Sequence, residues 1–456
     1  MTRKREIMLR FAVPLTLTVL LVAPNMAQQK GAKISLDQAI DIALERNISV
    51  IQAENTLEAQ ESGRLAAYGD LMPSLSASGS WSRSQIDRSS TTTQNLGGAT
   101  FTIAPSFNVT NSFSSGLSLN YTLFNGFANT ANLNRASSTV RAAEHALKRT
   151  RQQTTLDVTQ LYLNVLRTRE LLKVREENMK RSEKQLERIQ EANRVGSLSL
   201  ADVYRQQVQL SNDELSQIQA QNDYDKARAD LAFYLALPVM DEYDFSDPSI
   251  PLEIDTTDFA VVMNRYRNVD SVVGGALKTR PDYLSSVEAH NSAGSSVTGA
   301  WGGHLPTLSA FASYGTSSDQ FSRLWDNRTT TWGLQVSLPL FSGFRTDNLV
   351  QQAKVNERNA LEQMKQAERK VQIDIRKAML DFEAAQKQLD VTRKGVRSAQ
   401  EDRRIAEEKY NLGAGTLLDL LIANANYVSA LSNKVNGFYN YYFTKRQLEF
   451  STGTLK

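Results

Sequence analysis

Four stretches of the chain alternate between apolar and polar residues, and they form two pairs. In the first stretch, serines at every second position from Ser74 alternate with apolar or small residues such as Leu75 and Trp81. A period of two gives a strand one apolar and one polar face. The pairs predict β-hairpins at about 74–124 and about 307–341. Because the polar faces are small and uncharged and each strand is about ten residues long, we favour membrane-spanning strands over a half-buried soluble sheet.

Each predicted hairpin encloses a stretch rich in Ser, Thr, Asn and Gly. These stretches are 85–112 in the first hairpin and the shorter 317–330 in the second. Long polar loops are usual on the extracellular side of membrane barrels. The sequence therefore predicts that both hairpins turn in loops outside the cell.

A helical pattern follows each hairpin. Residues 128–195 contain neither glycine nor proline, and residues 345–412 contain only Gly395 as an interruption. Each stretch predicts a helix about 100 Å long. Apolar residues recur every seven positions along both, which is typical of helices packed as coiled coils. This heptad stripe consists of Val158, Val165, Leu172, Met179, Leu186, Ile375, Phe382, Leu389 and Val396.

Two shorter helices are predicted in the first half of the chain, at about 35–68 and about 199–237. Their combined length is close to that of the long helix. Stacked end to end, they would lie alongside the long helix over its whole length. Each half of the chain would thus contain two parallel helical rods, joined to a hairpin at one end and by a glycine turn at the other.

The second half of the chain repeats the first. The segment 123–127 recurs as 340–344, and Gly196 recurs as Gly413, both 217 positions later; upstream of the first hairpin the separation is 233. We call residues at these separations repeat equivalents. The sequence therefore predicts an α+β protein of two copies of helix, β-hairpin, long helix and helix. The copies are 28–237 and 270–456, and the proline-containing acidic segment 238–269 links them.

The N-terminus has the composition of a signal peptide. Four basic residues lie among the first ten, and a short apolar run ends near Ala27. The alternative is a membrane anchor, but the run is shorter than the roughly 20 residues that a span needs. We therefore expect residues 1–27 to be removed on export. The remaining chain has equal numbers of basic and acidic residues, so composition gives no indication of a nucleic-acid partner.

Composition also argues against a catalytic or metal site. The chain has no cysteine, which excludes a disulfide, a thiolate metal site, a catalytic thiol and a cysteine-linked lipid anchor. Its histidines, His145, His290 and His304, are far apart and lie in no metal-ligand spacing. We expect neither an enzyme nor a bound cofactor or metal.

Four amphipathic strands are too few to close a membrane barrel, since small barrels need about eight. Open sheet edges would leave backbone groups unpaired in lipid, where no water can satisfy them. The strand pattern therefore predicts an oligomer that shares one barrel. Three copies would contribute 12 strands and 12 helical rods, enough to enclose a lumen.

The order of several short motifs within this repeat resembles the TolC-type outer-membrane efflux proteins. The resemblance covers nearly all of the chain after the leader. It rests on both Leu-Phe-x-Gly-Phe segments, on both glycine turns and on the segments 36–39, 43–47 and 276–281. It implies a homotrimer with a 12-stranded β-barrel in the bacterial outer membrane and a 12-helix periplasmic α-barrel. It further implies partners, namely a periplasmic adaptor protein and an inner-membrane pump.

The function that follows is a passive exit duct of a tripartite efflux or type I secretion system, for small molecules or secreted polypeptides. The alternative is a structural envelope protein whose rods span the periplasm without a channel. The alternating strands favour the duct, because a spacer needs no barrel with a small polar inner face.

The resemblance assigns the two glycine turns to adaptor docking, because small residues at a tip allow close backbone approach. By resemblance, the segment 238–269 contributes to an equatorial belt around the tunnel. The predicted docking residues are Val195, Gly196, Ser197, Leu198, Leu412, Gly413, Ala414, Gly415 and Thr416.

Four residues near these turns are candidates for the periplasmic aperture. Asp419 matches a carboxylate that lines this aperture in the family, but the position one turn later is Ile422, so a second acidic ring is not expected. Tyr410 matches a tyrosine that helps to hold the closed tip in relatives, while Gly415 replaces an arginine. Asp202 is the repeat equivalent of Asp419. The alternative role for both aspartates is stabilisation of a helix N-terminus.

Six aromatic residues lie where predicted strands meet predicted helices. We expect them to form a girdle at the membrane interface; the alternative is ordinary packing between layers. These residues are Tyr68, Phe124, Phe127, Trp301, Phe341 and Phe344.

Overall fold

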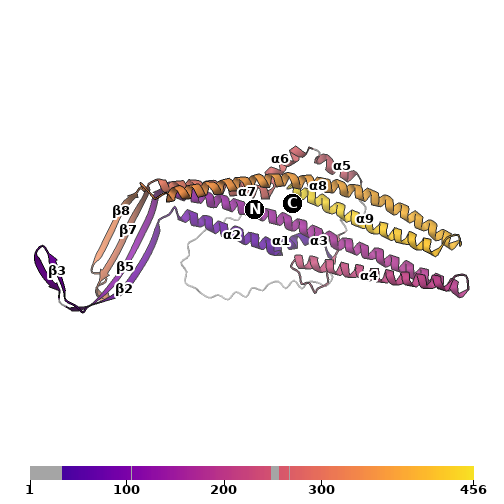
Figure 1. The fold of residues 1–456 in the computed structure, drawn as a ribbon, viewed down its shortest axis with the longest axis horizontal. Helices are drawn as coiled ribbons and strands as arrows, with labels where there is room; N and C mark the ends of the chain where they lie inside the picture. The colour runs from indigo at the N-terminus through magenta and orange to yellow at the C-terminus, as the bar shows by residue number, and fades with distance from the viewer. Residues whose placement is uncertain (1–32, 104, 248–255, 267, 456) are drawn as a thin grey trace.

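The structure, a computed structural model, describes residues 33–103, 105–247, 256–266 and 268–455. The signal peptide expected at 1–27 lies outside these residues. The protein is elongated, with a β-sheet at one end and long helical rods that extend away from it (Figure 1). Both hairpins of helices end at the pole opposite the sheet.

The sheet contains four antiparallel strands in the order β2-β5-β7-β8. Pairing of β5 with β7 joins the two repeats, with Leu119 opposite Ala312. A bulge interrupts this pairing between Thr122 and Phe124. Strands β2 and β8 are the two edges. The strand bounds are Ser74–Arg88 for β2, Ser106–Asn125 for β5, Thr307–Ser318 for β7 and Arg328–Ser337 for β8.

The hairpin ends differ from the prediction in both repeats. Much of the loop predicted at 85–112 is strand, because β2 and β5 continue and a small hairpin of β3 (Thr92–Leu96) and β4 (Ala99–Ile103) extends beyond them. Gly97 and Gly98 both have positive φ, as a two-residue hairpin turn requires. Conversely, β8 ends at Ser337 rather than near 341. The reason is Pro339, which has no N–H to donate to a neighbouring strand.

The helices confirm the predicted two-fold repeat of helix, hairpin, long helix and helix. Each long helix contains 67 residues. In the first repeat the helices are α1 (Leu36–Arg46), α2 (Ile48–Gly69), α3 (Ala128–Arg194) and α4 (Leu200–Tyr234). In the second they are α6 (Val269–Thr279), α7 (Pro281–Trp301), α8 (Arg345–Asn411) and α9 (Leu417–Ser451).

The single helix predicted at 35–68 is two helices, because Asn47 interrupts it. The backbone of Asn47 is extended, its side-chain oxygen accepts a hydrogen bond from the Ser49 amide at 2.9 Å, and its side-chain amide donates to the carbonyl of Tyr234. The same break occurs in the second repeat at Arg280, which precedes Pro281. A residue before proline avoids the helical conformation.

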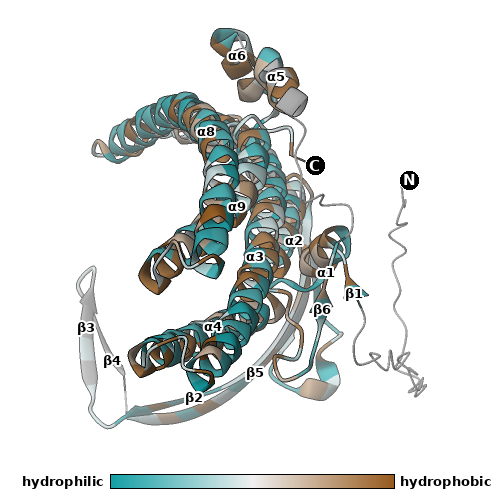
Figure 2. Ribbon diagram, turned by 90° about the vertical axis from the view of Figure 1, so that its right-hand side faces the viewer, coloured by the Kyte–Doolittle hydropathy of each residue, from teal (hydrophilic) through white to brown (hydrophobic). Residues whose placement is uncertain are grey.

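The long helices form a curved layer (Figure 2). In the half nearer the sheet, α3 packs between α2 and α7, and α7 packs against α8. In the far half, α3 packs between α4 and α9, and α9 packs against α8. One edge of the layer is therefore α2 followed by α4, and the other edge is α8. Within the described residues, every helix is too short or too polar to serve as a membrane span.

The main core lies at the middle of the rods. Six residues of the predicted heptad stripe are buried, namely Val158, Val165, Leu172, Ile375, Phe382 and Leu389. The short strands β1 (Lys33–Ile34) and β6 (Asp244–Phe245) pair in parallel beside this core. The helices α5 (Thr256–Arg265) and α6 lie outside α8, where they form a bulge on the rod (Figure 1).

Candidate functional site

The first glycine turn closes the tip of the α3–α4 hairpin. Gly196 has a φ of +78°, and the amide of Ser197 donates to the carbonyl of Ala192 at 2.9 Å, which ends α3. Val195 is 71% exposed, whereas Leu198 packs against a small apolar cluster. A Cβ atom on Gly196 would meet no atom of the protomer within 4 Å. The tip thus presents an open backbone surface beside one exposed valine.

The second turn, between α8 and α9, repeats this geometry. Gly413 has a φ of +71° and equally open surroundings, and Leu412 is 83% exposed. The amide of Ala414 donates to the carbonyl of Lys409 at 2.8 Å. Gly415 is different, because a Cβ atom there would lie 3.0 Å from that of Lys409. Of the three tip glycines, only Gly415 is therefore required by packing inside the protomer.

The structure brings the two tips together through one apolar cluster. Its buried members, Ile189, Val203 and Leu417, come from three helices, and Tyr410 packs against them. Burial raises the pKa of the Tyr410 phenol, and the Asp202 carboxylate raises it further. Among the described residues, the buried phenol oxygen has no hydrogen-bond partner. Within one protomer, Tyr410 thus contributes packing.

Both aspartates predicted for the aperture, Asp419 and Asp202, bond to the N-terminus of their own helix. The carboxylate of Asp419 accepts hydrogen bonds from the Thr416 hydroxyl at 2.6 Å and from the Thr416 amide at 3.1 Å. The hydroxyl contact, and then the amide contact, lower the pKa of Asp419. Asp202 contacts the Ser199 hydroxyl at 2.7 Å and Arg205 at 2.9 Å. These contacts are the helix-stabilising role that the sequence offered as the alternative.

Ile422 lies one turn beyond Asp419 on α9 and is 52% exposed. Leu418 beside it is exposed to a similar extent. The tip of the second repeat therefore presents a carboxylate that is held in place and two apolar side chains. Their arrangement around an aperture depends on other copies of the chain.

The two tip hairpins differ in the chemistry of their interior, which sequence reasoning missed. In the α3–α4 hairpin, the buried Asp213 accepts hydrogen bonds from Asn178 at 2.9 Å and Gln209 at 3.0 Å. Burial raises the pKa of Asp213. Gln206, 1% exposed, donates to Ser182. The repeat equivalents show the contrast: for Asn178, Ser182, Gln206 and Asp213 they are Gly395, Ala399, Ala423 and Ala430.

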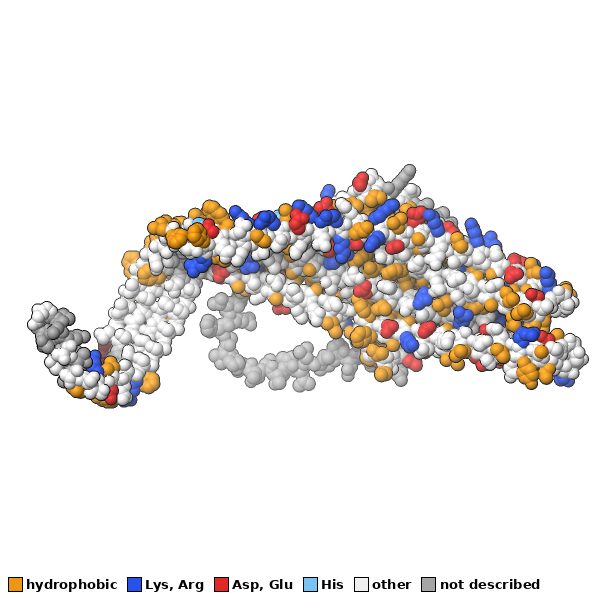
Figure 3. Space-filling model, viewed as in Figure 1, with side chains coloured by type: hydrophobic (Ala, Val, Ile, Leu, Met, Phe, Trp, Pro, Cys, Tyr) orange, Lys and Arg blue, Asp and Glu red, His pale blue; other side chains and the backbone are white. Residues whose placement is uncertain are grey.

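The six junction aromatics lie where the sheet meets the rods. Phe124 contacts Phe127 edge to face with ring centres 5.2 Å apart, and the equivalent pair Phe341 and Phe344 does so at 5.7 Å. Phe124 is half-buried, and the other five are substantially exposed. Hydrophobic side chains gather at this junction in Figure 3. Their exposure favours an interfacial girdle over internal packing.

A tight backbone contact lies at the same junction. A Cβ atom on Gly302, at the end of α7, would lie 2.6 Å from the carbonyl oxygen of Gly126, at the end of β5. The repeat equivalents, Gly69 and Gly343, have no atom within 4 Å of such a Cβ. Within one protomer, the backbones therefore meet at Gly126 and Gly302, whereas the equivalent positions Gly343 and Gly69 have no contact partner.

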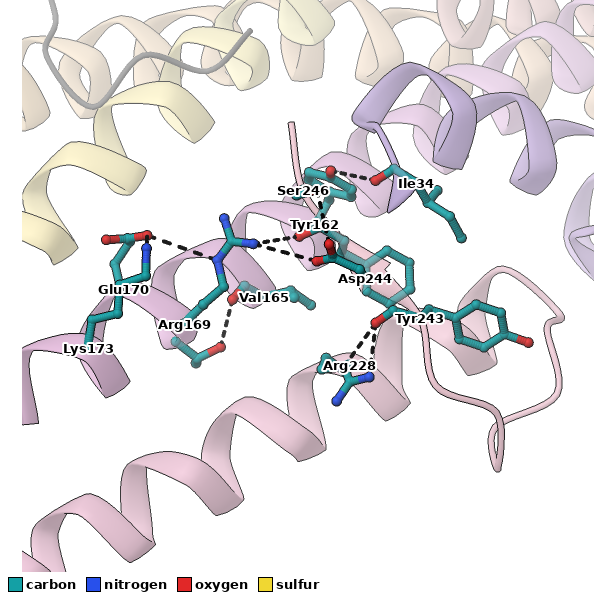
Figure 4. Close-up of polar contacts among 12 residues, drawn as sticks. Ile34, Tyr162, Val165, Arg169, Glu170, Lys173, Arg228, Tyr243, Asp244 and Ser246 are labelled. Carbon is teal, nitrogen blue, oxygen red and sulfur yellow. Dashed lines mark hydrogen bonds and ion pairs between the residues drawn. The ribbon is translucent and has the colours of Figure 1, made fainter. Parts of the chain in front are cut away.

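The segment after α4 is tied to α3 at the middle of the rods (Figure 4). Arg169 of α3 lies 3.8 Å from the Asp244 carboxylate, and Arg228 of α4 donates to the carbonyl of Tyr243 at 2.9 Å. The Tyr162 phenol donates to the backbone of β1 at 2.8 Å. The described part of the linker thus contacts the rods halfway along their length.

A buried ion cluster at the same level was not predicted. Arg280 is fully buried and contacts Asp282 at 2.6 Å, Asp374 at 3.1 Å and the carbonyl of Ser451 at 3.0 Å. It therefore joins the α6–α7 break to α8 and to the end of α9. The segment Arg280-Pro281-Asp282 was visible in the sequence, but nothing in its spacing identified Asp374 as a partner.

The histidines are dispersed, and the residues described by the structure include no group of three potential metal ligands. His304 lies 3.7 Å from Asp347 near the sheet, while His145 and His290 lie on α3 and α7.

Comparison with known proteins agrees with this architecture. The sequence profile of the family described as "Outer membrane efflux protein" matches residues 39–237 and 272–454. The chain is 25% identical over 322 residues to "Outer membrane protein TolC" of Escherichia coli (strain K12), and the match covers 67% of this chain and 62% of that protein. It is 25% identical over 334 residues to the TolC protein of Vibrio cholerae serotype O1, covering 71% and 73% respectively.

Two solved structures share the fold. The outer membrane protein VceC of Vibrio cholerae superposes with a TM-score of 0.77 at 19% identity, covering 92% of this chain and 96% of that one. The CmeC outer membrane channel of Campylobacter jejuni superposes with a TM-score of 0.75 at 20% identity, covering 98% and 94%.

Proposed function

The chain belongs to the outer membrane efflux protein family, and from this premise we propose that three copies form an outer-membrane exit duct. Its sheet would lie in the membrane and its rods in the periplasm. The duct would passively conduct substrates delivered by an inner-membrane pump and a periplasmic adaptor, in a tripartite efflux or type I secretion system. The substrates would be small molecules or secreted polypeptides.

The observation that carries this proposal is that both layers of the protomer are open on the same two sides. The sheet is open at β2 and β8, and the helical layer is open at α2 and α4 on one side and at α8 on the other. Strand edges cannot remain unpaired in lipid, and four strands cannot close on themselves. If each edge joins the opposite edge of another copy, the edge strands gain backbone hydrogen-bond partners and the edge helices gain packing partners.

The internal repeat specifies how the copies would meet. Within the protomer, β5 pairs with β7, and the repeat equivalents of these strands are β8 and β2. Likewise α3 packs against α7 and α9. The repeat equivalents of these three helices are α8, α2 and α4. Across the boundary between copies, α8 of one copy would therefore pack against α2 and α4 of the next. Each boundary between copies would therefore repeat the boundary between the two halves of one copy.

Exposed apolar residues on both edge helices support this arrangement. They leave apolar surface uncovered in the isolated protomer, which association would bury. On α4 they are Leu200, Tyr204, Val208, Leu215, Ile218 and Phe233. On α8 they are Leu349, Val355, Ile373, Leu380, Val391 and Ile405.

The absence of cysteine allows a direct test of the assembly. A Cβ atom on Gly299 would lie 3.6 Å from that of Ala131, within the range of a disulfide. The repeat equivalents of these residues are Ala66 and Asn348, both exposed in the protomer. We expect Ala66→Cys with Asn348→Cys to give covalently linked trimers on oxidation. Ala131→Cys with Gly299→Cys is the control, which should form a disulfide only within one copy.

The inner face of the sheet suits a water-filled duct. Small hydroxyl side chains cover most of it, together with Asn120, Gln335 and one aromatic ring, Phe311. The hydroxyls bond to each other across strands, as in Ser76 with Ser118 at 2.7 Å and Ser80 with Ser114 at 2.8 Å. A structural spacer is the alternative function. Conductance in planar bilayers separates the two: the duct predicts single-channel currents, and their absence from a cross-linked, inserted trimer would favour the spacer.

The glycine turns would dock the adaptor, because their open backbones leave room for close approach. The aperture would be formed by Asp419 and Ile422 of each copy, with Tyr410 and Asp202 in the layer behind them. The junction aromatics would lie at the periplasmic surface of the membrane.

A further inference from the structure

All charged residues of the two β-hairpins lie at the ends farthest from the rods. The segments 74–82, 106–125, 307–318 and 329–337 contain no Asp, Glu, Lys or Arg. In Figure 3 the sheet accordingly has few coloured side chains until its outer end. The charged residues there are Arg83, Asp87, Arg88, Asp319, Arg323, Asp326 and Arg328.

Two of these arginines belong to the apolar face of the sheet. On β2, the alternation that includes Leu75 and Trp81 continues directly to Arg83. On β8, the alternation that includes Trp332 continues to Arg328. Arg88 lies at the end of β2 on the opposite, serine-lined face. If the sheet forms a membrane barrel, the apolar face contacts lipid, and so do Arg83 and Arg328.

The two arginines also lie at similar distances along their strands from the rods. Arg83 is nine residues from the first residue of β2, and Arg328 is nine residues from the last residue of β8, both counted from the end next to the rods. Nine residues extend about 30 Å along a strand, which a tilt of about 40° reduces to about 23 Å along the membrane normal. The apolar band of a membrane barrel is about 25 Å tall. Both arginines would therefore lie at the outer headgroups.

Aromatic residues mark this level as a second interface. Trp81 lies two residues before Arg83 on the same face of β2. Its ring stacks on Phe113 with ring centres 6.4 Å apart, and Phe113 contacts Phe321 of the β7–β8 loop. Trp332 is 81% exposed on β8. Since the junction aromatics lie at the opposite end of the same strands, the sheet has an aromatic belt at each end.

Neither arginine has a carboxylate partner among the described residues. Arg83 is exposed, and Arg328 uses only Nε, which donates to the carbonyl of Trp325 at 3.1 Å. Asp87 is on the same face as Arg83 but about 13 Å farther along the strand. Within one copy, both guanidinium groups therefore keep their two terminal nitrogens for an outside acceptor. The planar fork of a guanidinium matches phosphate oxygens in particular.

We propose that Arg83 and Arg328 bind the phosphate groups of lipids in the outer leaflet, just above the outer aromatic belt. This inference rests on the proposed function, because it requires the sheet to be inserted in the membrane. Each boundary between copies brings β8 of one copy beside β2 of the next. Repeating the β5–β7 register there places Arg83 opposite Trp332, and Arg328 opposite Asp87 of the neighbouring copy. In the assembled barrel Arg83 therefore has no carboxylate opposite it, whereas Arg328 would share its guanidinium between Asp87 and a lipid phosphate.

The test compares binding of diphosphoryl and monophosphoryl lipid A to the purified full-length trimer, by native mass spectrometry and by titration in detergent. We expect the wild type to bind the diphosphoryl form at least about tenfold more tightly. Arg83→Gln with Arg328→Gln should remove this preference. Arg83→Lys with Arg328→Lys should keep a weaker preference, because the charge remains without the fork. Arg88→Gln, on the opposite face of β2, is the matched control and should bind as the wild type does.

Insertion is measured separately for every variant, as a heat-modifiable trimer that floats with liposomes. A wild type that does not insert would contradict the proposed function. Inserted wild type that binds both lipids equally would overturn the phosphate inference alone. The inference would also be overturned if the double glutamine variant kept the preference, or if Arg88→Gln lost it, since the effect would then come from overall charge.

Discussion

Gly126 and Gly302 meet backbone to backbone where the sheet joins the rods, so closely that neither can accept a Cβ atom without displacing the other. Gly126 directly follows strand β5 of the first repeat, and Gly302 caps the C-terminus of helix α7 of the second. The contact therefore fixes the halves of the protomer to each other at the level where the proposed membrane surface begins.

This contact makes the repeat argument testable at single residues. Gly302→Ala should destabilise the protomer by about 1–3 kcal/mol, the usual effect of overpacking. Gly69→Ala, at the open equivalent position, should leave the protomer stable but weaken the trimer, because Gly69 would meet Gly343 of the next copy. Thermal unfolding and native mass spectrometry measure the two effects.

The control is Gly63→Ala, at an open helical position, which should be neutral or slightly stabilising. A Gly69→Ala protein that forms trimers as stable as the wild type would contradict the proposed boundary at this point.

Two substitutions at Gly413 can show why glycine is needed at the turns, either for its small size or for its backbone conformation. Both have positive φ, which costs alanine about 1 kcal/mol but which asparagine tolerates. If docking needs a small residue, Gly413→Asn should impair efflux more than Gly413→Ala does. If backbone conformation alone matters, the order should reverse. Efflux is measured by substrate accumulation in cells, with trimer yield as the control.

Asp419 should determine cation selectivity at the periplasmic mouth. Its hydrogen bonds with Thr416 lower its pKa, so its charge should persist in mildly acidic solution. Asp419→Asn keeps a helix-capping side chain but removes the charge. We expect weaker block by multivalent cations and a shift towards anions in planar-bilayer recordings, with unchanged trimer stability.

Asp202→Asn is the comparison, and it should change these currents less because Arg205 already neutralises Asp202. The opposite ranking of the two variants would show that the first-repeat hairpin, and not the second, lines the aperture.

Stability of the tip should depend on the ionisation of Asp213. Burial raises its pKa, so the folded protein binds this proton more tightly than the unfolded chain does. The stability linked to the group is complete below the unfolded pKa and is lost as pH rises through the folded value. Asp213→Asn keeps an acceptor oxygen for Asn178 and Gln209. It should therefore raise Tm by a few degrees at pH 7–8 and have little effect near pH 4. A gain in Tm that is equal at both pH values would contradict this account.

The sequence was most informative where one local pattern decides the structure. The seven-residue stripe predicted the buried faces of α3 and α8, as Val158 and Phe382 show, because a helix of this length can pack only along its stripe. The alternation predicted the sheet for the same reason. Local breaks were missed, because Asn47 interrupts a helix only through a cap and a contact with Tyr234, 187 positions away.

The candidate site was less accessible from sequence. The turn glycines and Asp419 could be located by repeat and resemblance, but the bonding of Asp419 to Thr416 depends on side-chain geometry. The polar interior around Asp213 and the partners of Arg280 depend on which helix faces meet. Comparison of repeat equivalents was the one signal that could have revealed the first of these, since Asp213 corresponds to Ala430.

The equal length of α3 and α8, 67 residues each, limits how this chain can change during evolution. An insertion in one helix alone would move one tip away from the other and shift its heptad stripe against its neighbours. A change that keeps both tips level must alter both helices, and α4 and α9 with them, by whole multiples of seven residues. Proteins of this architecture that reach across a wider or narrower periplasm should therefore differ by paired insertions at equivalent places in the two repeats.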